Sequence, residues 1–387
     1  MGPLDGVRVV ELASIGPGPF CGMMLADLGA EVIRVERLPA GDAAAAPADP
    51  LLRNRRSIAL DLRRPQAVEA LLRLLEGSDI LFEGYRPGVA ERLGVGPETC
   101  LARNPRLVYG RMTGWGQDGP LAGAAGHDIN FIALSGALHL IGQSGGKPVP
   151  PLNVVGDFGG GGMLLAFGLL AAYIESRRSG RGQVIDASMV DGVVALLGMS
   201  FAQRAAGEFV DRTGENFLGG AAPWYDSYLT RDGKYVAIGA VEPQFFMLLL
   251  EKIGLDGQRW APLGYPATGD AARQAWPELR AALAKIFASR TRAEWCDLLE
   301  GTDCCFAPVL SLAEAAVHPH NVARGTFIHV GGVEQNAPAP RFSRTRNSAV
   351  RPPRPPGADT MAVLLEAGLS VSDIDRLRPP PHTGQQS

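Results

Sequence analysis

The first 36 residues constrain the fold of this chain more than any other stretch. Residues 7–12 read as a strand, a Gly-Pro-Gly-Pro run at 16–19 interrupts it, and residues 20–28 read as a helix that ends at Gly29; residues 31–36 then read as a second strand. Two strands joined by a helix form a βαβ unit, which has parallel strands and a right-handed crossover. The pattern therefore predicts an α/β domain built on a parallel sheet.

Strands and helices continue to alternate beyond this unit. The further strands are expected at residues 57–60, 80–82, 107–111 and 183–186, and the helices at 66–75, 89–93, 163–176 and 188–207. This alternation is typical of a doubly wound, Rossmann-like parallel sheet. We predict that it forms a large α/β domain covering residues 1–207.

A change of pattern after residue 207 indicates a second domain. Residues 208–221 read as a linker, and residues 222–325 as a smaller α+β domain with a hairpin at 225–239 that turns at Asp232-Gly233. Its helices are expected at 244–253, 277–289 and 292–300. A proline-rich arm and a short helix at 359–367 follow, and we expect residues 326–377 to return and pack on the large domain. Residues 378–387 are expected to be a disordered tail.

Composition excludes several classes of protein. The 387 residues are 46% hydrophobic and 20% charged, with a net charge of −3, which argues against long disorder and against a dedicated nucleic-acid binder. The five cysteines are odd in number and contain no C-x-x-C pair, which predicts neither disulfides nor a metal site and favours a cytoplasmic protein. The N-terminus lacks the features of a signal peptide. The longest apolar run, residues 163–174, is too short to span a membrane.

Two features of the predicted sheet suggest a phosphate-bearing ligand. Gly16, Gly18 and Gly22 resemble a dinucleotide fingerprint, but their spacing is wrong by one residue, so a tight turn with close helix packing is the simpler interpretation. Arginines at positions 37, 53, 86 and 92 follow strands or begin helices, at the sheet edge where such folds bind ligands. Arginine suits phosphate geometry, although a solvated surface role stays open for each of them.

Three ionisable residues could carry chemistry. His127 lies among glycine and polar residues, where a structural histidine is the alternative. Asp157 precedes four glycines and an apolar helix; it is either an N-cap or an active carboxylate next to backbone amides that could hold an oxyanion. Glu242 follows a predicted strand, and by itself it reads equally as a surface carboxylate.

Taken together, several segments resemble the family-III CoA-transferase (CaiB/BaiF) superfamily. They are GPLDGVRVVEL at 2–12, ADLGAEVIRVE at 26–36, NRRS at 54–57, EGYRPG at 83–88, GWGQDGP at 114–120 and GQVIDASMVDG at 182–192. Three others resemble its α-methylacyl-CoA racemase branch: GHDIN at 126–130, PPLNVVGD at 150–157 and EPQFF at 242–246. The resemblance covers nearly the whole chain.

The resemblance implies an isomerase that interconverts (2R)- and (2S)-2-methylacyl-CoA thioesters. His127 and Asp157 would be the two acid/base residues on opposite faces of a planar enolate, and Glu242 would pair with His127. The transferase branch implies an alternative, in which Asp157 is a nucleophile that carries CoA between acids. A protein that binds a CoA thioester without turnover is a third reading, which the presence of all three residues disfavours.

The same resemblance implies a set of binding residues and partners. Arg37, Arg86 and Arg92 would meet CoA phosphates, with Arg53 and Arg55 as weaker candidates. CoA binding would also involve Ala59, Asp61 and Asp128; the acyl end would meet Asn153, Tyr225 and Asp226; and the amides of Gly159 and Gly160 would hold the enolate oxygen. Met112, Met163, Met189 and Met199 could form an adaptable acyl surface, or fill the core. The chemistry needs no cofactor beyond the CoA of the substrate, and an interlocked homodimer is implied.

Overall fold

A computed structural model describes residues 2–37 and 49–377 of the chain, which form two compact units. Unit 1 comprises Met1–Ser135, Leu152–Leu196 and Gly325–Ser387, and unit 2 comprises Gly136–Pro151 and Leu197–Arg324. We predicted that the large domain extends to residue 207, whereas unit 1 ends at Leu196 in that part of the chain. The next helix, α9 (Gly198–Ala205), has no buried residue and therefore adds nothing to the core of unit 1. The predicted tail at 378–387 lies outside the described residues.

Unit 1 contains a six-stranded sheet in which all neighbouring strands are parallel, and this confirms the predicted doubly wound fold class. The strand order is β3-β2-β1-β4-β5-β6, the order of a Rossmann sheet. The strands are β1 (Arg8–Leu12), β2 (Glu31–Glu36), β3 (Arg56–Ala59), β4 (Ile80–Glu83), β5 (Val108–Thr113) and β6 (Gln183–Ser188). The order reverses between β1 and β4, so the carboxyl ends of these two strands are where such a sheet binds ligands.

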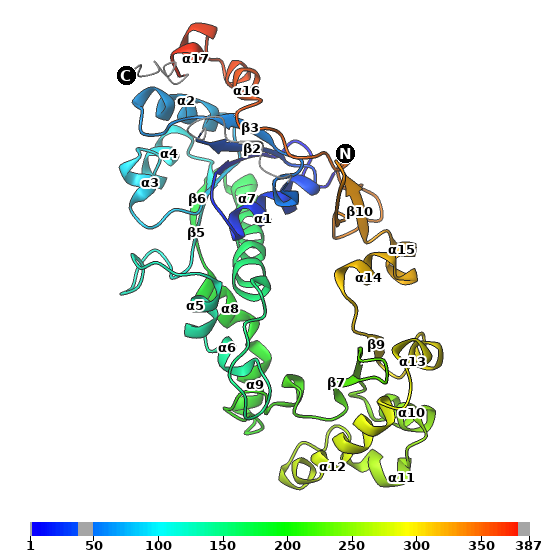
Figure 1. The fold of residues 1–387 in the computed structure, drawn as a ribbon. Coiled ribbons are helices and arrows are strands. Elements are labelled where there is room, and N and C mark those ends of the chain that lie inside the picture. The colour runs from blue at the N-terminus through cyan, green and yellow to red at the C-terminus, as the bar shows by residue number, and fades with distance from the viewer. Residues whose placement is uncertain (1, 38–48, 378–387) are drawn as a thin grey trace, which may run out of the picture. The chain divides into compact units, whose positions relative to one another are not determined.

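Helices cover both faces of the sheet (Figure 1). On one face lie α1 (Pro17–Asp27) and α7 (Leu164–Ser179), and on the other α2 (Pro65–Leu75), α4 (Pro97–Arg103), α16 (Thr360–Glu366) and α17 (Val371–Leu377). In α2, positions 67, 70, 71, 74 and 75 are buried, which is the spacing of one helical face. The remaining helices of unit 1 are α3 (Val89–Arg92), α5 (Asp128–Leu134) and α8 (Met189–Leu196).

The glycine run that follows Asp157 forms part of a wide helical segment, η2 (Val154–Met163), that continues into α7. Glycine is required there because neighbouring elements come very close. A Cβ atom on Gly160 would lie 2.6 Å from Val193 of α8, and one on Gly162 would lie 2.7 Å from Phe20 of α1. We had expected a ligand to explain the run; the structure explains it by close helix packing instead.

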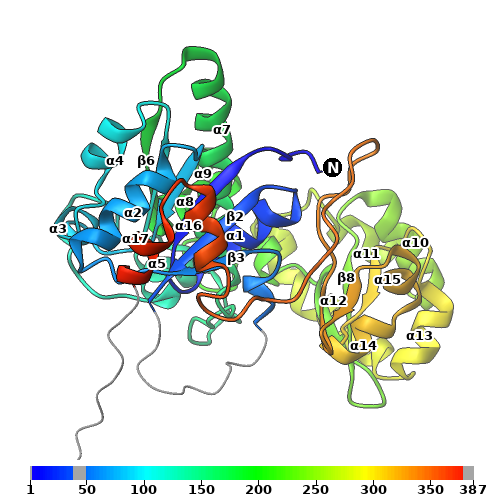
Figure 2. The same cartoon turned by 90° about the horizontal axis from the view of Figure 1, so that it is seen from above.

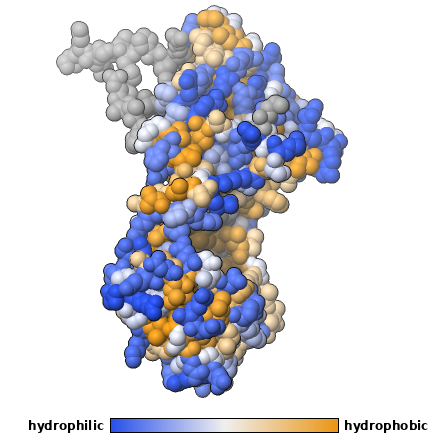
Figure 3. All heavy atoms as spheres, turned by 90° about the vertical axis from the view of Figure 1, so that its right-hand side faces the viewer, coloured by the Kyte–Doolittle hydropathy of each residue, from blue (hydrophilic) through white to orange (hydrophobic). Residues whose placement is uncertain are grey.

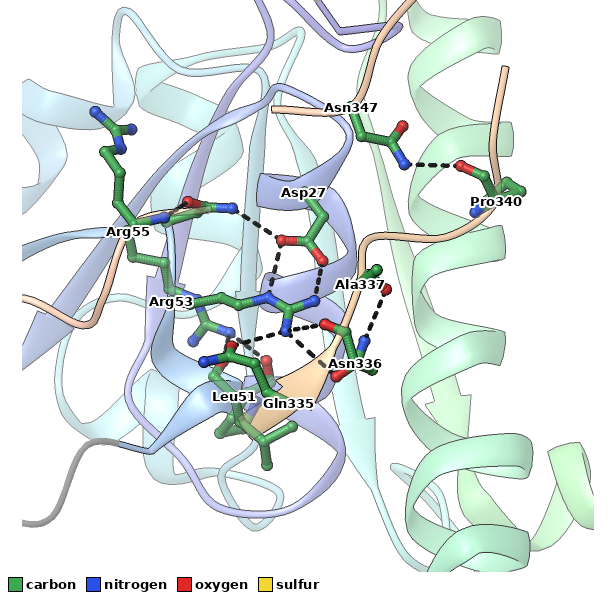
Figure 4. A network of polar contacts seen from close by, with 12 residues as sticks. Asp27, Leu51, Arg53, Arg55, Gln335, Asn336, Ala337, Pro340 and Asn347 are labelled. Atoms are coloured by element: carbon green, nitrogen blue, oxygen red, sulfur yellow. Dashed lines mark hydrogen bonds and ion pairs between the residues drawn. The ribbon is translucent and has the colours of Figure 1, made fainter. Parts of the chain in front are cut away.

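A buried polar network joins the returning C-terminal arm to the N-terminal part of unit 1 (Figure 4). Arg53 is fully buried and donates to Asp27, with Nε–Oδ1 and Nη2–Oδ2 distances of 3.1 and 2.5 Å. Its Nη1 donates to the side chain of Gln335 and the backbone carbonyl of Asn336, both at 2.9 Å. These two residues belong to a hairpin made of β10 (Phe327–Val330) and β11 (Val333–Asn336). Removing one partner of such a buried ion pair costs about 3–5 kcal/mol.

Two arginines that we considered as weaker phosphate contacts are therefore structural. Arg53 is saturated by the network above. Arg55 is also buried, and it donates to Glu11 at 2.6 Å and to two backbone carbonyls. Guanidinium donors that buried protein acceptors already engage are not offered to a phosphate.

The segment after the hairpin covers the outer edge of the sheet, as Figures 1 and 2 both show. The Ser57 amide of β3 donates to the Asp359 side chain at 3.0 Å, and the Asp359 amide donates back to the Ser57 carbonyl at 2.8 Å. The Ala59 amide donates to Thr360 Oγ1 at 2.9 Å. The edge strand β3 thus finds partners for its free backbone groups in the arm, which blocks pairing with another chain.

Unit 2 is an α+β unit with its own aromatic core. Its antiparallel sheet has the order β7 (Tyr225–Leu229), β8 (Tyr235–Gly239) and β9 (Phe306–Pro308), and the predicted hairpin is confirmed. Trp224, Trp276 and Trp295 are buried in the core. Its helices are α6 (Ala137–Leu140), α9, α10 (Pro243–Ile253), α11 (Gly257–Trp260), α12 (Asp270–Phe287), α13 (Arg292–Leu299), α14 (Leu312–Val317) and α15 (Pro319–Arg324).

Several helix boundaries differ from the sequence prediction. The helix predicted at 20–28 begins earlier, at Pro17, because proline is tolerated in the first turn of a helix. The helix predicted at 277–289 is α12, which begins seven positions earlier, at Asp270, and contains Pro277. The residues before this proline have a high helix propensity, so the helix extends through it. Trp276, Leu279 and Leu283 then lie on one face and pack into the core together. The helix predicted at 188–207 is broken at Leu197 into α8 and α9.

Hydrophilic residues cover most of the face drawn in Figure 3, with apolar residues in smaller patches. Within the described residues, one continuous helical segment, Val154–Ser179, is long and apolar enough to cross a bilayer by length and composition alone. Core helices of soluble proteins pass the same test, and Leu165 and Leu169 of this segment are fully buried against the sheet.

Candidate active site

A cavity of about 350 Å³ lies in unit 1 at the carboxyl ends of β1, β4 and β5. Its walls include residues 14–17, which follow β1, residues 84–87, which follow β4, and residues 112–115, at the end of β5 and just beyond it. His127 and Asp157 both line this cavity. The structure therefore brings together the two residues that the sequence analysis proposed as acid and base, at the switch point of the sheet.

Asp157 lies in the first turn of η2, where its carboxylate is half-buried. Its Oδ2 accepts a hydrogen bond from Asn153 Nδ2 at 3.2 Å. Burial raises the pKa of Asp157, and the negative charge of Asp128 adds to the rise, whereas the Asn153 hydrogen bond and the charge of His127 oppose it. A raised pKa makes a carboxylate a stronger base for removing a proton.

His127 precedes α5, and its exposed side chain faces the cavity. The backbone is fixed there by Asn130, whose side chain accepts a hydrogen bond from the His127 amide at 3.0 Å. The next residue, Asp128, is buried and accepts from the Asp157 amide at 2.7 Å. Through Asp128, the start of α5 is tied directly to the start of η2, so the segments that carry the imidazole and the carboxylate are held in a fixed relation.

The other Asp128 oxygen, Oδ1, is buried and has no hydrogen-bond partner. An unpartnered buried carboxylate oxygen is costly, and a donor group of a ligand would relieve that cost. This geometry suits the predicted role of Asp128 in binding the CoA part of a substrate, because CoA carries amide N–H groups. It also explains why position 156 is glycine, since a Cβ atom there would lie 2.5 Å from Asp128 Oδ2.

Other predicted CoA contacts lie at the same edge of the sheet. Arg86 is exposed and lines the cavity, Arg37 is exposed directly after β2, and Arg92 is exposed in α3. Asp61 follows β3 and is bonded to Arg63 at 2.6 Å; this hydrogen bond lowers the pKa of Asp61 to about 2, with a smaller contribution from the charge of Arg37. Ala59 ends β3, and its amide is bonded to Thr360.

The glycines predicted to hold an oxyanion occupy a different environment from the one we expected. Gly159 and Gly160 lie inside η2, where each N–H donates to the carbonyl five residues earlier. Their amides thus have partners within the helix, and Gly160 is buried against α8. The structure gives these two residues a packing role and offers no free amide there for an enolate oxygen.

Three predicted residues belong to unit 2. Glu242 is exposed and precedes α10, and its backbone carbonyl accepts from the amides of Phe245 and Phe246 at 3.0 Å. Tyr225 and Asp226 lie in β7, and the Asp226 carboxylate forms an ion pair with Arg280. The predicted pairing of Glu242 with His127 and the predicted contacts of Tyr225 and Asp226 with the acyl end stay predictions.

The cavity also has lining residues that the sequence analysis did not single out. They include Ser14, Thr113 and Trp115. Of the four methionines proposed for an acyl surface, Met112 and Met189 line this cavity. Their positions shortly after predicted strands could have indicated them, because a parallel sheet binds ligands at the carboxyl ends of its strands. Across residues 2–37 and 49–377, no group of three or more His, Cys, Asp or Glu side chains is placed to hold a metal ion.

A Rossmann sheet with a His–Asp pair at its switch point defines an enzyme-like site for a phosphate-bearing ligand. The sequence pattern of CoA-transferase family III matches residues 4–360, and the chain belongs to this family. Within it, the chain is similar to the α-methylacyl-CoA racemase of Mus musculus, with 47% identity covering 97% of this chain and 96% of the mouse protein. It is also similar to the α-methylacyl-CoA racemase of Homo sapiens, at 42% identity with the same two coverages.

A solved structure shares the fold. The crystal structure of a CaiB/BaiF family protein from Brucella suis matches with a TM-score of 0.79 and 28% identity, over 95% of this chain and 99% of that one. The fold described above is therefore shared with an experimentally determined family member.

Proposed function

We propose that this chain is an α-methylacyl-CoA racemase that interconverts (2R)- and (2S)-2-methylacyl-CoA thioesters. The observation that carries the proposal is the pair of proton-transfer groups, His127 and Asp157, in one cavity at the sheet's ligand-binding edge. The similarity to two α-methylacyl-CoA racemases over almost the full chain supports it. The alternative, a CoA-transferase, would need Asp157 but gives no role to His127.

The geometry suits proton transfer at one carbon. The hydrogen next to a thioester carbonyl is removed by a base on one face, which leaves a planar enolate. An acid on the other face then returns a proton with inverted configuration. The raised pKa of Asp157 makes its carboxylate a stronger base, and the imidazole of His127 offers a ring nitrogen that can accept a proton and an N–H that can donate one. We propose that Glu242 pairs with the imidazole of His127 and that no cofactor is needed beyond the CoA of the substrate.

The decisive experiment follows the α-hydrogen. A single enantiomer of a 2-methylacyl-CoA, incubated with the enzyme in D₂O without an acceptor acid, is expected to take up deuterium at carbon 2 and to lose optical purity. NMR measures the deuterium and optical rotation measures the inversion. A preparation that binds the thioester but shows neither deuterium uptake nor inversion would contradict the racemase proposal. The next experiment would then be a screen of acceptor acids for CoA transfer.

We also propose that the enzyme is a homodimer. Several large apolar side chains of α7 and η2 are exposed on unit 1, among them Phe167 at 72%, Ile174 at 57% and Met163 at 46%. Apolar surface of this kind is typical of an interface between subunits. Light scattering during size-exclusion chromatography is expected to give about twice the chain mass of 40.9 kDa. Phe167→Glu would place a charge in this surface, and a dimer that persists in that variant would rule out α7 as the interface.

A further inference from the structure

One buried carboxylate next to a wall of the cavity has no part in the proposed chemistry. Glu83 ends β4, and its side chain is fully buried. Its Oε2 accepts from the Tyr85 amide at 2.5 Å, and its Oε1 accepts from Arg111 Nε at 3.1 Å. The residues that follow it, at positions 84–87, form one wall of the cavity and include Arg86. Glu83 therefore ties the strand, the wall and β5 together.

The groups around Glu83 come from three elements. Arg111 and Tyr109 face it from β5, Glu91 faces it from α3, and Tyr85 belongs to the wall itself. Arg111 also binds Glu91 at 2.8 Å, so its positive charge is shared between two carboxylates. Burial raises the pKa of Glu83 to about 7, against the opposing effects of the Tyr85 amide and Arg111. Glu83 thus changes its charge in the range where the enzyme would work.

The wall has little freedom to move while Glu83 is a carboxylate. A Cβ atom on Gly84 would lie 2.9 Å from Ser14, so the wall already touches the loop after β1. Both Glu83 oxygens are acceptors that face N–H donors. A proton on either oxygen would weaken one of these two contacts, because a donor would then face a donor. An unmatched buried polar group is unfavourable, and this favours another position of the wall.

We propose that Glu83 is a positioning residue for the CoA part of the substrate. As a carboxylate it holds the 84–87 wall, with Arg86, in the binding position. When it takes up a proton it releases the wall, and affinity for the ligand falls toward acidic pH. This inference rests on the proposed function, because the ligand is taken to be an acyl-CoA.

The expected size of the effect follows from the ionised fraction. With half-ionisation near pH 7, about one tenth of the protein is competent at pH 6 and about nine tenths at pH 8. The dissociation constant should therefore be about tenfold larger at pH 6 than at pH 8.

Unfolding cannot account for the loss. Because the pKa of Glu83 is raised in the folded state, its proton uptake favours folding. Its contribution to stability is fully present below the ordinary pKa of 4.5 and is lost as the pH rises through about 7. Through this group, the folded state thus becomes more stable over the same interval in which the ligand binds less tightly.

The test is the affinity for 3′-dephospho-CoA between pH 6 and 8, measured by titration calorimetry. This probe has no phosphate monoester, so its own charge is constant in that range. The unaltered enzyme should lose about tenfold in affinity toward pH 6. Glu83→Gln should bind weakly at both values with a flat pH profile, because one of its contacts opposes two donors at any pH. The matched control is Glu69→Gln, which removes an exposed carboxylate of α2 that is paired with Arg103 and should keep the original profile.

The outcomes distinguish the inference about Glu83 from the proposed function. If the unaltered enzyme binds the probe equally at pH 6 and 8, or Glu83→Gln keeps its pH dependence, the inference about Glu83 is wrong while the proposed function stands. If the unaltered enzyme binds neither this probe nor CoA at any pH, the proposed function itself is wrong. Should Glu83→Gln fail to fold by circular dichroism, Glu91→Gln still tests the inference: it removes a charge that raises the pKa of Glu83, so the loss of affinity should move to lower pH, and an unmoved profile would contradict the inference.

Discussion

Replacing His127 with alanine is expected to lower kcat for racemisation by about 10²–10⁴-fold while acyl-CoA binding stays nearly intact. The magnitude is the usual contribution of one positioned acid/base group. Binding should be little affected because the imidazole is an exposed group on the cavity wall and holds no other element in place. Turnover is measured as loss of optical rotation, and binding by calorimetry with the same thioester.

The variant should also reveal which enantiomer His127 serves. Without the imidazole, Asp157 can still remove the α-hydrogen from the enantiomer that presents it to the carboxylate. That enantiomer should exchange its α-hydrogen for deuterium with retention of configuration, while the other should not exchange. His139→Ala is the control, since this histidine is half-exposed and belongs to unit 2. Unchanged racemisation by His127→Ala would remove His127 from the mechanism.

The sheet could be predicted from sequence because its signals are local. Strands such as β1, β2 and β4 are short apolar runs, and the crossovers after β1 and β3 contain the tightly packed helix α1 and the amphipathic helix α2. The candidate acid and base followed from the same logic, since segments after strands of a parallel sheet meet at one edge. Short elements such as α4, α17 and β9 were missed because their few buried residues leave no clear period.

Contacts between distant segments could not be predicted. Arg53 looked like a phosphate ligand because its partners, Asp27 and Gln335, are 26 and 282 positions away along the chain. The glycines at 159–162 looked like an anion site because the sequence does not show that α1 and α8 pack against them. In both cases the residue type correctly indicated that another group lies close to it. The sequence could not say whether a ligand or the protein itself makes that approach.

Replacing Asp157 with asparagine is expected to reduce racemisation by a similar factor of about 10²–10⁴ without unfolding the protein. Asparagine has nearly the same shape, and its carbonyl oxygen can keep the hydrogen bond from Asn153. The Asp157 amide, which binds Asp128, is unchanged by the substitution. The matched control is Asp118→Asn, an exposed position that does not line the cavity. Racemisation close to that of the unaltered enzyme would exclude Asp157 as an acid/base group.

Asp157→Asn becomes most informative beside His127→Ala. In a two-base racemase the variants should exchange opposite enantiomers in D₂O, because each retains the group on one face of the enolate. A transferase predicts another pattern: Asp157→Asn abolishes transfer of CoA to an acceptor acid and any covalent adduct at this position, whereas His127→Ala leaves both. Exchange of the same enantiomer by both variants would fit neither reading and would require a third proton-transfer group in the cavity.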